Sequence, residues 1–281
     1  MSALSVFRQQ AVGLGTWRIG EDRAHAAAEV GAILHALERG VRVIDTAEMY
    51  ADGESERLVG SALKSFGADR RESLCIVSKA LPMNAGRKRA VAACEASLKR
   101  LGLDYLDVYL LHWEGHVPYH ETLEAFAELR ERGLIRHWGV SNFDLPELQQ
   151  WIATEQRMGL QHCATNQVYY SLLARGPEFD LLPAMSTMAM PLMAYTPLGS
   201  GELARDPRLA AIAQPLGLSA AQLALAWTVR SGKVVAIPKS STPARIDQNF
   251  AAAAITLPDD VLAKIDALFA PPKRKLPLQM I

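Results

Sequence analysis

Several features that mark other classes of protein are absent from this sequence of 281 residues. Lysine plus arginine equals aspartate plus glutamate, at 30 residues each, and no long run of one sign occurs, so we expect no nucleic-acid groove and no polybasic membrane anchor. The three cysteines, an odd number without CxxC or Cys/His spacing, predict reduced core thiols and no disulfide framework. A small molecule is therefore the expected partner.

Long hydrophobic runs are also missing. No apolar stretch reaches the roughly 18 residues typical of a membrane span, and residues 1–10 lack the charged and apolar regions of a leader. We therefore expect a cytoplasmic protein, and we also expect a monomer. The length fits one large domain or two average ones, but no linker or low-complexity tract divides the chain. Residues 1–281 are predicted to form one domain.

What the sequence does contain is a repeated alternation of short apolar runs and helical patterns. Eight apolar runs each end in a polar or aromatic residue: Trp17, Asp45, Lys79, His112, Ser141, Gln167, Tyr195 and Lys239. Their intervals of 28, 34, 33, 29, 26, 28 and 44 residues are close to the roughly 30 that one strand-and-helix unit needs. The sequence therefore predicts an α/β fold, a (β/α)₈ TIM barrel, which typically has about 250 residues.

The expected elements follow from this alternation. Short runs rich in β-branched or aromatic residues predict strands at 41–44, 74–77, 105–111, 135–140 and 234–237. Helical patterns lie at 24–39, 56–66, 87–101, 121–132, 145–156 and 220–230. The wide last interval predicts an extra cofactor loop after the seventh strand, residues 196–218, laid over the barrel mouth before a helix begins near Ser219.

Four side chains at the ends of three consecutive strands point to chemistry. Asp45 ends the second apolar run, Tyr50 lies on the loop after it, and Lys79 and His112 end the next two runs. Barrel enzymes build their sites at the carboxyl ends of strands, so we expect these groups to meet. The Tyr50 phenol can donate a proton at neutral pH, and the Lys79 ammonium would lower its pKa. Asp45 would be the counter-ion of Lys79, and neutral His112 would hold the substrate oxygen.

Each of these residues also has a structural interpretation. Asp45 and Lys79 could form an ion pair at the barrel rim. Tyr50 could be a surface tyrosine and His112 a satisfied core histidine. The convergence of all four at one end favours catalysis. A metal-dependent sugar isomerase would need paired carboxylates and histidine ligands, for which only Asp45 and His112 are candidates, so we expect no metal.

Five segments resemble the signature segments of the aldo-keto reductases: Asp45-Thr-Ala-Glu-Met-Tyr50, Ser78-Lys79, Leu110-Leu-His112-Trp113, Gly139-Val-Ser-Asn142 and Ile237-Pro-Lys-Ser240. The resemblance runs in order from Gly13 to about Asn249. It implies NADPH-dependent reduction of aldehydes or ketones to alcohols. It also implies that Tyr50 is the proton donor, that Lys79 and Asp45 tune it, and that His112 orients the carbonyl.

The resemblance also assigns residues to the nicotinamide end of NADPH. It implies that Ser141, Asn142 and Gln167 hold the carboxamide and that Tyr195 stacks on the ring, although loop polarity and a core tyrosine are alternatives for each alone. The loop Pro197-Leu198-Gly199-Ser200-Gly201 would cross the pyrophosphate, its alternative being a flexible glycine loop. Gly13-Leu-Gly15 has Arg18 where a dinucleotide fingerprint has its third glycine, so we expect a tight turn and no Rossmann domain.

Residues 239–245 join a strand end to a helix start, where free backbone N–H groups and two cations favour a phosphate. A helix cap with Thr242 at N-cap and Pro243 at N1 is compatible with that role. The resemblance implies that the adenosine phosphate and the adenine are bound by Lys239, Ser240, Ser241, Arg245, Gln248 and Asn249. Many relatives carry glutamate where Gln248 stands, which leaves the choice between NADPH and NADH open.

The expected substrate is a small carbonyl compound. Trp17, Met49 and Trp113 should line the pocket, with the tryptophans as flat apolar walls, or else as packing at the barrel rim. Further segments at 48–52, 84–85, 93–97 and 163–167 resemble bacterial members of the family that reduce ketoaldehydes such as methylglyoxal. The basic tail, residues 271–281, either reaches the pocket or is solvated. A non-catalytic NADP(H)-binding sensor on the same barrel is the alternative function.

Overall fold

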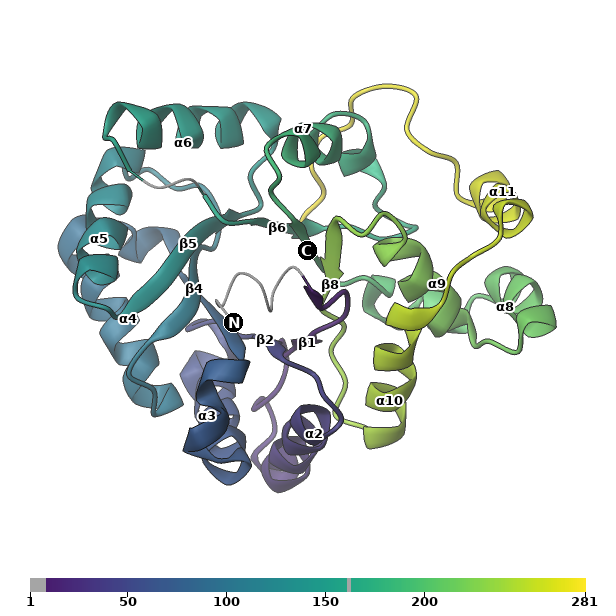
Figure 1. The fold of residues 1–281 in the computed structure, drawn as a ribbon, viewed down its shortest axis with the longest axis horizontal. Coiled ribbons are helices and arrows are strands. Elements are labelled where there is room, and N and C mark those ends of the chain that lie inside the picture. The colour runs from purple at the N-terminus through teal and green to yellow at the C-terminus, as the bar shows by residue number, and fades with distance from the viewer. Residues whose placement is uncertain (1–8, 161–162) are drawn as a thin grey trace.

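Eight parallel strands in sequence order form one sheet in the computed structural model, which describes residues 9–160 and 163–281 (Figure 1). No leader is expected in residues 1–10, and residues 1–8 of that segment lie outside the described range. The strands are β1 (Leu14–Gly15), β2 (Val43–Asp45), β3 (Cys75–Ala80), β4 (Leu106–Leu111), β5 (Ile135–Ser141), β6 (Asn166–Tyr169), β7 (Leu192–Tyr195) and β8 (Val234–Ala236).

The sheet closes on itself where the chain after β8 meets the first strand. Val12 pairs with Ala236 and Gly15 with Lys239, both in parallel register. The Gly15 N–H donates to the Pro238 carbonyl at 3.2 Å. A Cβ on Gly15 would lie 2.6 Å from the Ile237 carbonyl oxygen, so this close approach requires glycine. The predicted (β/α)₈ barrel is therefore confirmed.

The helices surround the barrel, as Figure 1 shows. Six match the predicted helical patterns: α2 (Ala26–Glu38), α3 (Glu54–Phe66), α4 (Arg87–Leu101), α5 (Tyr119–Glu131), α6 (Leu145–Arg157) and α9 (Ala220–Val229). The others are α7 (Leu181–Thr187), α8 (Pro207–Ala213), α10 (Pro243–Ala251) and α11 (Asp259–Leu268). Of these, only the start of α10 was expected. Within the described residues no single helix is long and apolar enough to cross a membrane. The bent pair of helical segments 207–216 and 220–229 is long and apolar enough only when the two are taken together, by length and composition alone.

The segment after β7 differs from the predicted loop. It contains α8, whose N-cap Asp206 accepts hydrogen bonds from the backbone N–H groups of Arg208 and Leu209, and which starts at Pro207. Leu209 and Ala213 are buried, and α8 lies outside the barrel beside α9 and α11 (Figure 1). The prediction of a loop throughout residues 196–218 was wrong for residues 207–213, because the apolar face of this helix packs against neighbouring helices. The predicted helix start at Ser219 is correct, since Ser219 and Gln222 form a capping box.

Side-chain alternation along the strands positions the functional residues. The barrel interior is filled by Val43, Cys75, Val77, Val108, Leu110, Met193, Val235 and Ile237. Because side chains alternate with a period of two, the next inward positions on β2, β3 and β4 belong to Asp45, Lys79 and His112. These three are buried. Hydrophobic strands therefore lead directly to a polar layer at one end of the barrel.

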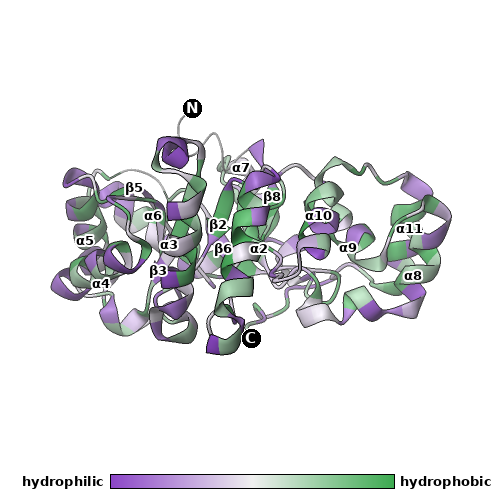
Figure 2. Ribbon diagram, turned by 90° about the horizontal axis from the view of Figure 1, so that it is seen from below, coloured by the Kyte–Doolittle hydropathy of each residue, from purple (hydrophilic) through white to green (hydrophobic). Residues whose placement is uncertain are grey.

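The other faces of the strands pack against the helices. Tyr109 of β4 packs against Phe126 of α5, and Phe126 in turn packs against Trp151 of α6, with ring centroids 5.4 and 6.3 Å apart. Figure 2 shows hydrophobic strands at the centre and hydrophilic residues on the outer helix faces. The C-terminus lies at the end where the strands finish.

A pair of glycine substitutions tests this packing. A Cβ at Gly139 in β5 would lie 2.5 Å from the Thr165 carbonyl oxygen and 2.8 Å from a Leu110 methyl group. We expect Gly139→Ala to lower the free energy of unfolding by about 1–3 kcal/mol through overpacking. Gly31→Ala is the control, because no atom lies within 4 Å of its Cβ position in α2. Gly31→Ala should raise the free energy of unfolding, measured by urea unfolding, by about 0.5–1 kcal/mol. Equal effects of both substitutions would contradict the packing described.

Candidate active site

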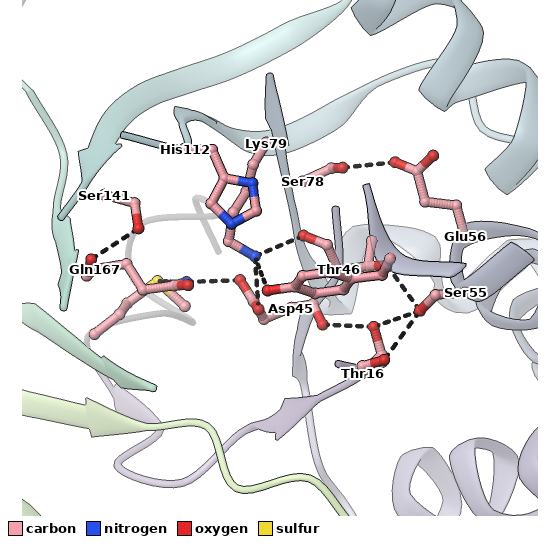
Figure 3. A network of polar contacts seen from close by, with 12 residues as sticks. Thr16, Asp45, Thr46, Ser55, Glu56, Ser78, Lys79, His112, Ser141 and Gln167 are labelled. Atoms are coloured by element: carbon pink, nitrogen blue, oxygen red, sulfur yellow. Dashed lines mark hydrogen bonds and ion pairs between the residues drawn. The ribbon is translucent and has the colours of Figure 1, made fainter. Parts of the chain in front are cut away.

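A buried ammonium group lies at the centre of the polar layer. Lys79 Nζ donates to Asp45 Oδ2 at 2.8 Å, to the Thr46 carbonyl at 2.8 Å and to Tyr50 Oη at 3.0 Å. Figure 3 shows this convergence, with Asp45 and Lys79 reaching the same point from adjacent strands. The three contacts use all three N–H bonds of the ammonium group. The predicted meeting of Asp45, Tyr50 and Lys79 is therefore present.

The ion pair offsets the cost of burial for Lys79 and part of that cost for Asp45. Burial lowers the pKa of Lys79, but Asp45 and Tyr50 raise it above its ordinary value, so the lysine is charged. Burial raises the pKa of Asp45 despite Lys79 and the hydrogen bond that Gln167 Nε2 donates to Asp45 Oδ1 at 2.6 Å. Removal of one partner of such a pair costs about 3–5 kcal/mol, because the other charge is left uncompensated.

The pKa of Tyr50 differs from the predicted direction. Burial raises it above its usual value, and this effect outweighs the lowering by Lys79. The expected interaction with Lys79 exists, but the sequence could not show that the phenol is 9% exposed. Tyr50 therefore keeps its proton throughout the neutral pH range, with a cation 3.0 Å away that would stabilise the phenolate once the proton leaves.

His112 is held neutral beside the phenol. Its ring lies edge-on to the Tyr50 ring, with centroids 5.9 Å apart. Burial, aided by repulsion from Lys79, lowers the pKa of His112 to about 2. Its Nδ1 is buried and has no hydrogen-bond partner among the described residues. A satisfied core histidine does not fit this finding, because one ring nitrogen has no protein partner.

The backbone after Tyr50 is in a strained conformation. Ala51 and Asp52 have φ values of 48° and 51°, in the left-handed region, and Gly53 follows with φ of 80°. Two consecutive non-glycine residues in this region persist only where their surroundings fix them. Glu48 supplies part of that support, since it accepts hydrogen bonds from the Leu81 N–H at 2.7 Å and from Asn84 Nδ2 at 2.9 Å.

A set of buried hydroxyl groups behind the site was not predicted. Ser55 Oγ donates to Thr16 Oγ1 at 2.8 Å and lies 3.2 Å from Thr46 Oγ1. Thr16 Oγ1 in turn donates to the Asp45 carbonyl at 2.9 Å (Figure 3). These contacts fix the β2 end that carries Asp45 and Thr46. Threonine and serine are common in loops, so sequence alone gives no reason to single these out.

The four residues assigned to nicotinamide form one connected group. Ser141 Oγ donates to the Gln167 carbonyl at 2.9 Å. Asn142 Nδ2 donates to the His112 carbonyl at 3.1 Å, and Tyr195 Oη donates to Asn142 Oδ1 at 2.8 Å. Ser141 and Tyr195 end their strands as predicted, whereas Gln167 lies within β6. The Tyr195 ring stacks on Tyr169 with an interplanar angle of 18°.

The residues assigned to the phosphates lie after β8 and after β7. Lys239 and Arg245 are exposed, while Ser240 and Asn249 are buried; Ser241 is half-buried and Gln248 exposed. Thr242 is the N-cap of α10 with Pro243 at N1, as expected, and its side chain makes no cap hydrogen bond. Ser240 Oγ instead accepts from the Thr242 N–H at 3.1 Å. Of the loop after β7, Pro197 is buried, Leu198 half-buried and Ser200 exposed.

Of the expected substrate residues, Trp113 contacts the tetrad. Trp113 is half-buried, with its ring centroid 4.9 Å from that of His112. Trp17 lies two residues beyond β1 under the Arg18 guanidinium, and Met49 is 42% exposed. The tail also reaches this region, because the Ile281 backbone lies close to the Tyr195 hydroxyl. Among the residues that the structure describes, no group of three or more His, Cys, Asp or Glu side chains could hold a metal ion.

Comparison with known proteins gives consistent matches. The model of the Aldo/keto reductase family matches residues 11–270. "Methylglyoxal reductase YeaE" of Escherichia coli is 46% identical over 96% of this chain and 95% of its own length. A Klebsiella pneumoniae aldo-keto reductase solved in complex with NADPH matches with a TM-score of 0.90 and 44% identity, over 96% of this chain and 95% of that chain. An aldo-keto reductase of Mycolicibacterium smegmatis is 38% identical over 85% of this chain and 82% of its own length.

The low pKa of His112 predicts a pH dependence of stability. An unfolded histidine binds a proton near pH 6.5, whereas folded His112 does so only near pH 2, so the stability held by the neutral ring falls as pH is lowered below 6.5. Between pH 7 and pH 5, wild type should lose about 2 kcal/mol more than His112→Asn in denaturant unfolding. His116→Asn, at an exposed position, is the control and should follow the wild type. Parallel loss in wild type and His112→Asn would show that the ring is not held neutral.

Proposed function

Because this chain belongs to the aldo/keto reductase family of oxidoreductases, we propose that it reduces small aldehydes and ketoaldehydes, such as methylglyoxal, with NADPH. The observation that carries this proposal is the contact of the buried Lys79 ammonium with both Asp45 and Tyr50, beside neutral His112. A protein that only binds a nucleotide has no need for a charged lysine at zero exposure against a phenol. The sensor alternative therefore has less support.

The residues present fit NADPH. At one end, amide and hydroxyl groups of Ser141, Asn142 and Gln167 would bind the carboxamide, and the half-buried Tyr195 ring would stack on the nicotinamide. At the other end, the start of α10 offers backbone N–H groups that its N-cap side chain does not occupy, together with the exposed cations of Lys239 and Arg245. Two arginine or lysine charges suit a phosphate dianion better than a ribose hydroxyl.

The chain's own residues would handle the proton. When bound, the nicotinamide supplies a hydride to the carbonyl carbon. Tyr50 would donate its proton to the carbonyl oxygen, because its raised pKa keeps the phenol protonated at neutral pH. The Lys79 ammonium, 3.0 Å from Tyr50 Oη, would then stabilise the phenolate. Asp45 keeps Lys79 charged and in place through this cycle.

His112 would orient the substrate. A neutral imidazole can donate one hydrogen bond to the carbonyl oxygen without competing as a proton source. Its contact with Trp113 fixes the ring, and Trp113, Trp17 and Met49 would enclose a small apolar substituent. The connection from His112 to the start of α5 at Tyr119 is short, so small carbonyl compounds are favoured over large ones.

Removal of the phenolic hydroxyl tests the proton donor. Tyr50→Phe should lower the kcat for methylglyoxal by about 10²–10⁴-fold, with NADPH binding nearly unchanged in a fluorescence titration. Tyr105→Phe is the matched control, because Tyr105 precedes β4 and stacks with Arg71 and Arg136. It should retain wild-type activity. More than about a tenth of the wild-type rate in Tyr50→Phe would rule out this donor.

A second substitution tests the choice of cofactor. Arg245→Ala should weaken NADPH binding by about 10–100-fold through loss of a charge-assisted contact to the 2′-phosphate, and leave NADH binding unchanged. Isothermal titration with both cofactors measures this difference. Lys233→Ala, an exposed cation just before β8, is the control and should affect neither. An equal loss for NADPH and NADH would place the 2′-phosphate elsewhere.

A further inference from the structure

A second buried ion pair lies behind the candidate site, between α3 and α4. The Glu56 side chain has no exposed surface, and its carboxylate accepts from Arg100 Nε at 2.5 Å. The other oxygen of Glu56 accepts from Ser78 Oγ at 2.6 Å (Figure 3). Arg100 Nη2 also donates to Ser97 Oγ at 3.0 Å, which fixes the guanidinium on α4. A buried carboxylate with both oxygens occupied holds its neighbours in one arrangement.

One end of this pair reaches the strand that carries the site lysine. Ser78 precedes Lys79 in β3, and side chains alternate along a strand. Ser78 therefore points outward to Glu56 of α3, while Lys79 points into the barrel. The hydrogen bond between Ser78 and Glu56 thus fixes the β3 backbone one residue before Lys79.

The other end of the pair lies against the turn that carries Tyr50. A Cβ on Gly53 would lie 2.5 Å from Arg100 Cδ and 2.6 Å from Arg100 Nε, so this side chain passes directly against the glycine. Gly53 closes the turn that contains the left-handed residues Ala51 and Asp52. A strained turn of this kind persists only where its surroundings fix it. Arg100 is therefore part of the support that keeps Tyr50 turned inward.

We propose that Glu56 and Arg100 are positioning residues for proton transfer, which brace the turn of Tyr50 against the strand of Lys79. The effect on the reaction rests on the proposed function, whereas the bracing does not. The contact that they maintain is the 3.0 Å hydrogen bond between Lys79 Nζ and Tyr50 Oη. Misplacement of reacting groups by about 1 Å can lower a rate by about 100-fold, so a small movement of the turn is enough.

Another buried ion pair on the same strand provides a matched control. Arg71 and Asp107 lie 2.7 Å apart, with side-chain exposures of 13% and 3%, against 19% and 0% for the first pair. Asp107 accepts from the Ile76 N–H at 2.9 Å, near the start of β3 and so at the barrel end opposite to the site. Loss of either carboxylate leaves an arginine without its partner, so both losses should destabilise the fold to a similar extent.

Steady-state kinetics tests the positioning. In Glu56→Met the kcat for methylglyoxal should fall by about 10–100-fold, with KM and the Kd for NADPH within about twofold of wild type. Glu56→Gln should restore kcat to within about threefold of wild type, because its amide can accept from Arg100 and donate to Ser78. Asp107→Leu should keep the wild-type kcat, although its melting temperature falls as in Glu56→Met. Equal kcat values in Glu56→Met and Asp107→Leu would overturn the positioning role.

The NMR signal of the Tyr50 ring tests the bracing without reference to activity. With carbon-13 at Cζ of the seven tyrosines, the signal that Tyr50→Phe removes is that of Tyr50. Its chemical shift reports the hydrogen bond at the phenol, so it should move in Glu56→Met and stay unchanged in Asp107→Leu. Ser78→Ala breaks the contact with β3 but leaves the ion pair, so it should move the signal in the same direction by less. This milder variant decides the bracing where Glu56→Met does not fold.

The possible results separate the bracing from the proposed function. An unmoved Tyr50 signal in Glu56→Met and Ser78→Ala would overturn the bracing. A moved signal with wild-type kcat would overturn the positioning role. Failure of the wild-type protein to reduce methylglyoxal would refute the proposed function, while the NMR result would still decide the bracing.

Discussion

The buried ion pair of Lys79 and Asp45 is the constraint on which the site depends. A charged lysine at zero exposure has to be paired, and its three N–H groups are used by Asp45, Thr46 and Tyr50. Apolar residues of similar size would fill the same space without the desolvation cost. The pair is therefore better understood as a device that fixes the Tyr50 hydroxyl and supplies a positive charge to it than as a source of stability.

The surroundings of the ion pair hold it at one orientation. Gln167 reaches across the barrel to the second oxygen of Asp45, and buried hydroxyl groups on Thr16 and Ser55 fix the backbone of β2 from behind. The left-handed residues Ala51 and Asp52 then turn the chain so that Tyr50 faces inward. Strain in the backbone and a satisfied polar network thus act together, which is a common arrangement at functional sites.

The sequence predicted most of the barrel and the tetrad for a physical reason. Parallel strands buried on both faces are short apolar runs, and the residue that ends each run lies at the same barrel end, so Asp45, Lys79 and His112 could be placed without coordinates. The place of Tyr50 directly after the second run added the phenol, and the resemblance to a family added the cofactor residues. The sequence did not show α8, because Asp206-Pro207 is equally typical of a turn. It also did not show the net pKa shift of Tyr50, because that shift depends on burial. Contacts across long sequence separations, such as that between Lys275 and Asp144, have no local pattern.

The closing seam of the barrel lies between short strands. β1 has two residues and β8 three, and they meet through isolated bridges, whereas β3 and β4 pair over six-residue strands. Asp45 borders one side of this seam through Gly15, and Lys239 pairs with Gly15 from the other. A ligand in contact with both Asp45 and Lys239 would link the two sides of the seam. Such a ligand would stabilise the folded chain, since it would bind the closed barrel and not the unfolded chain.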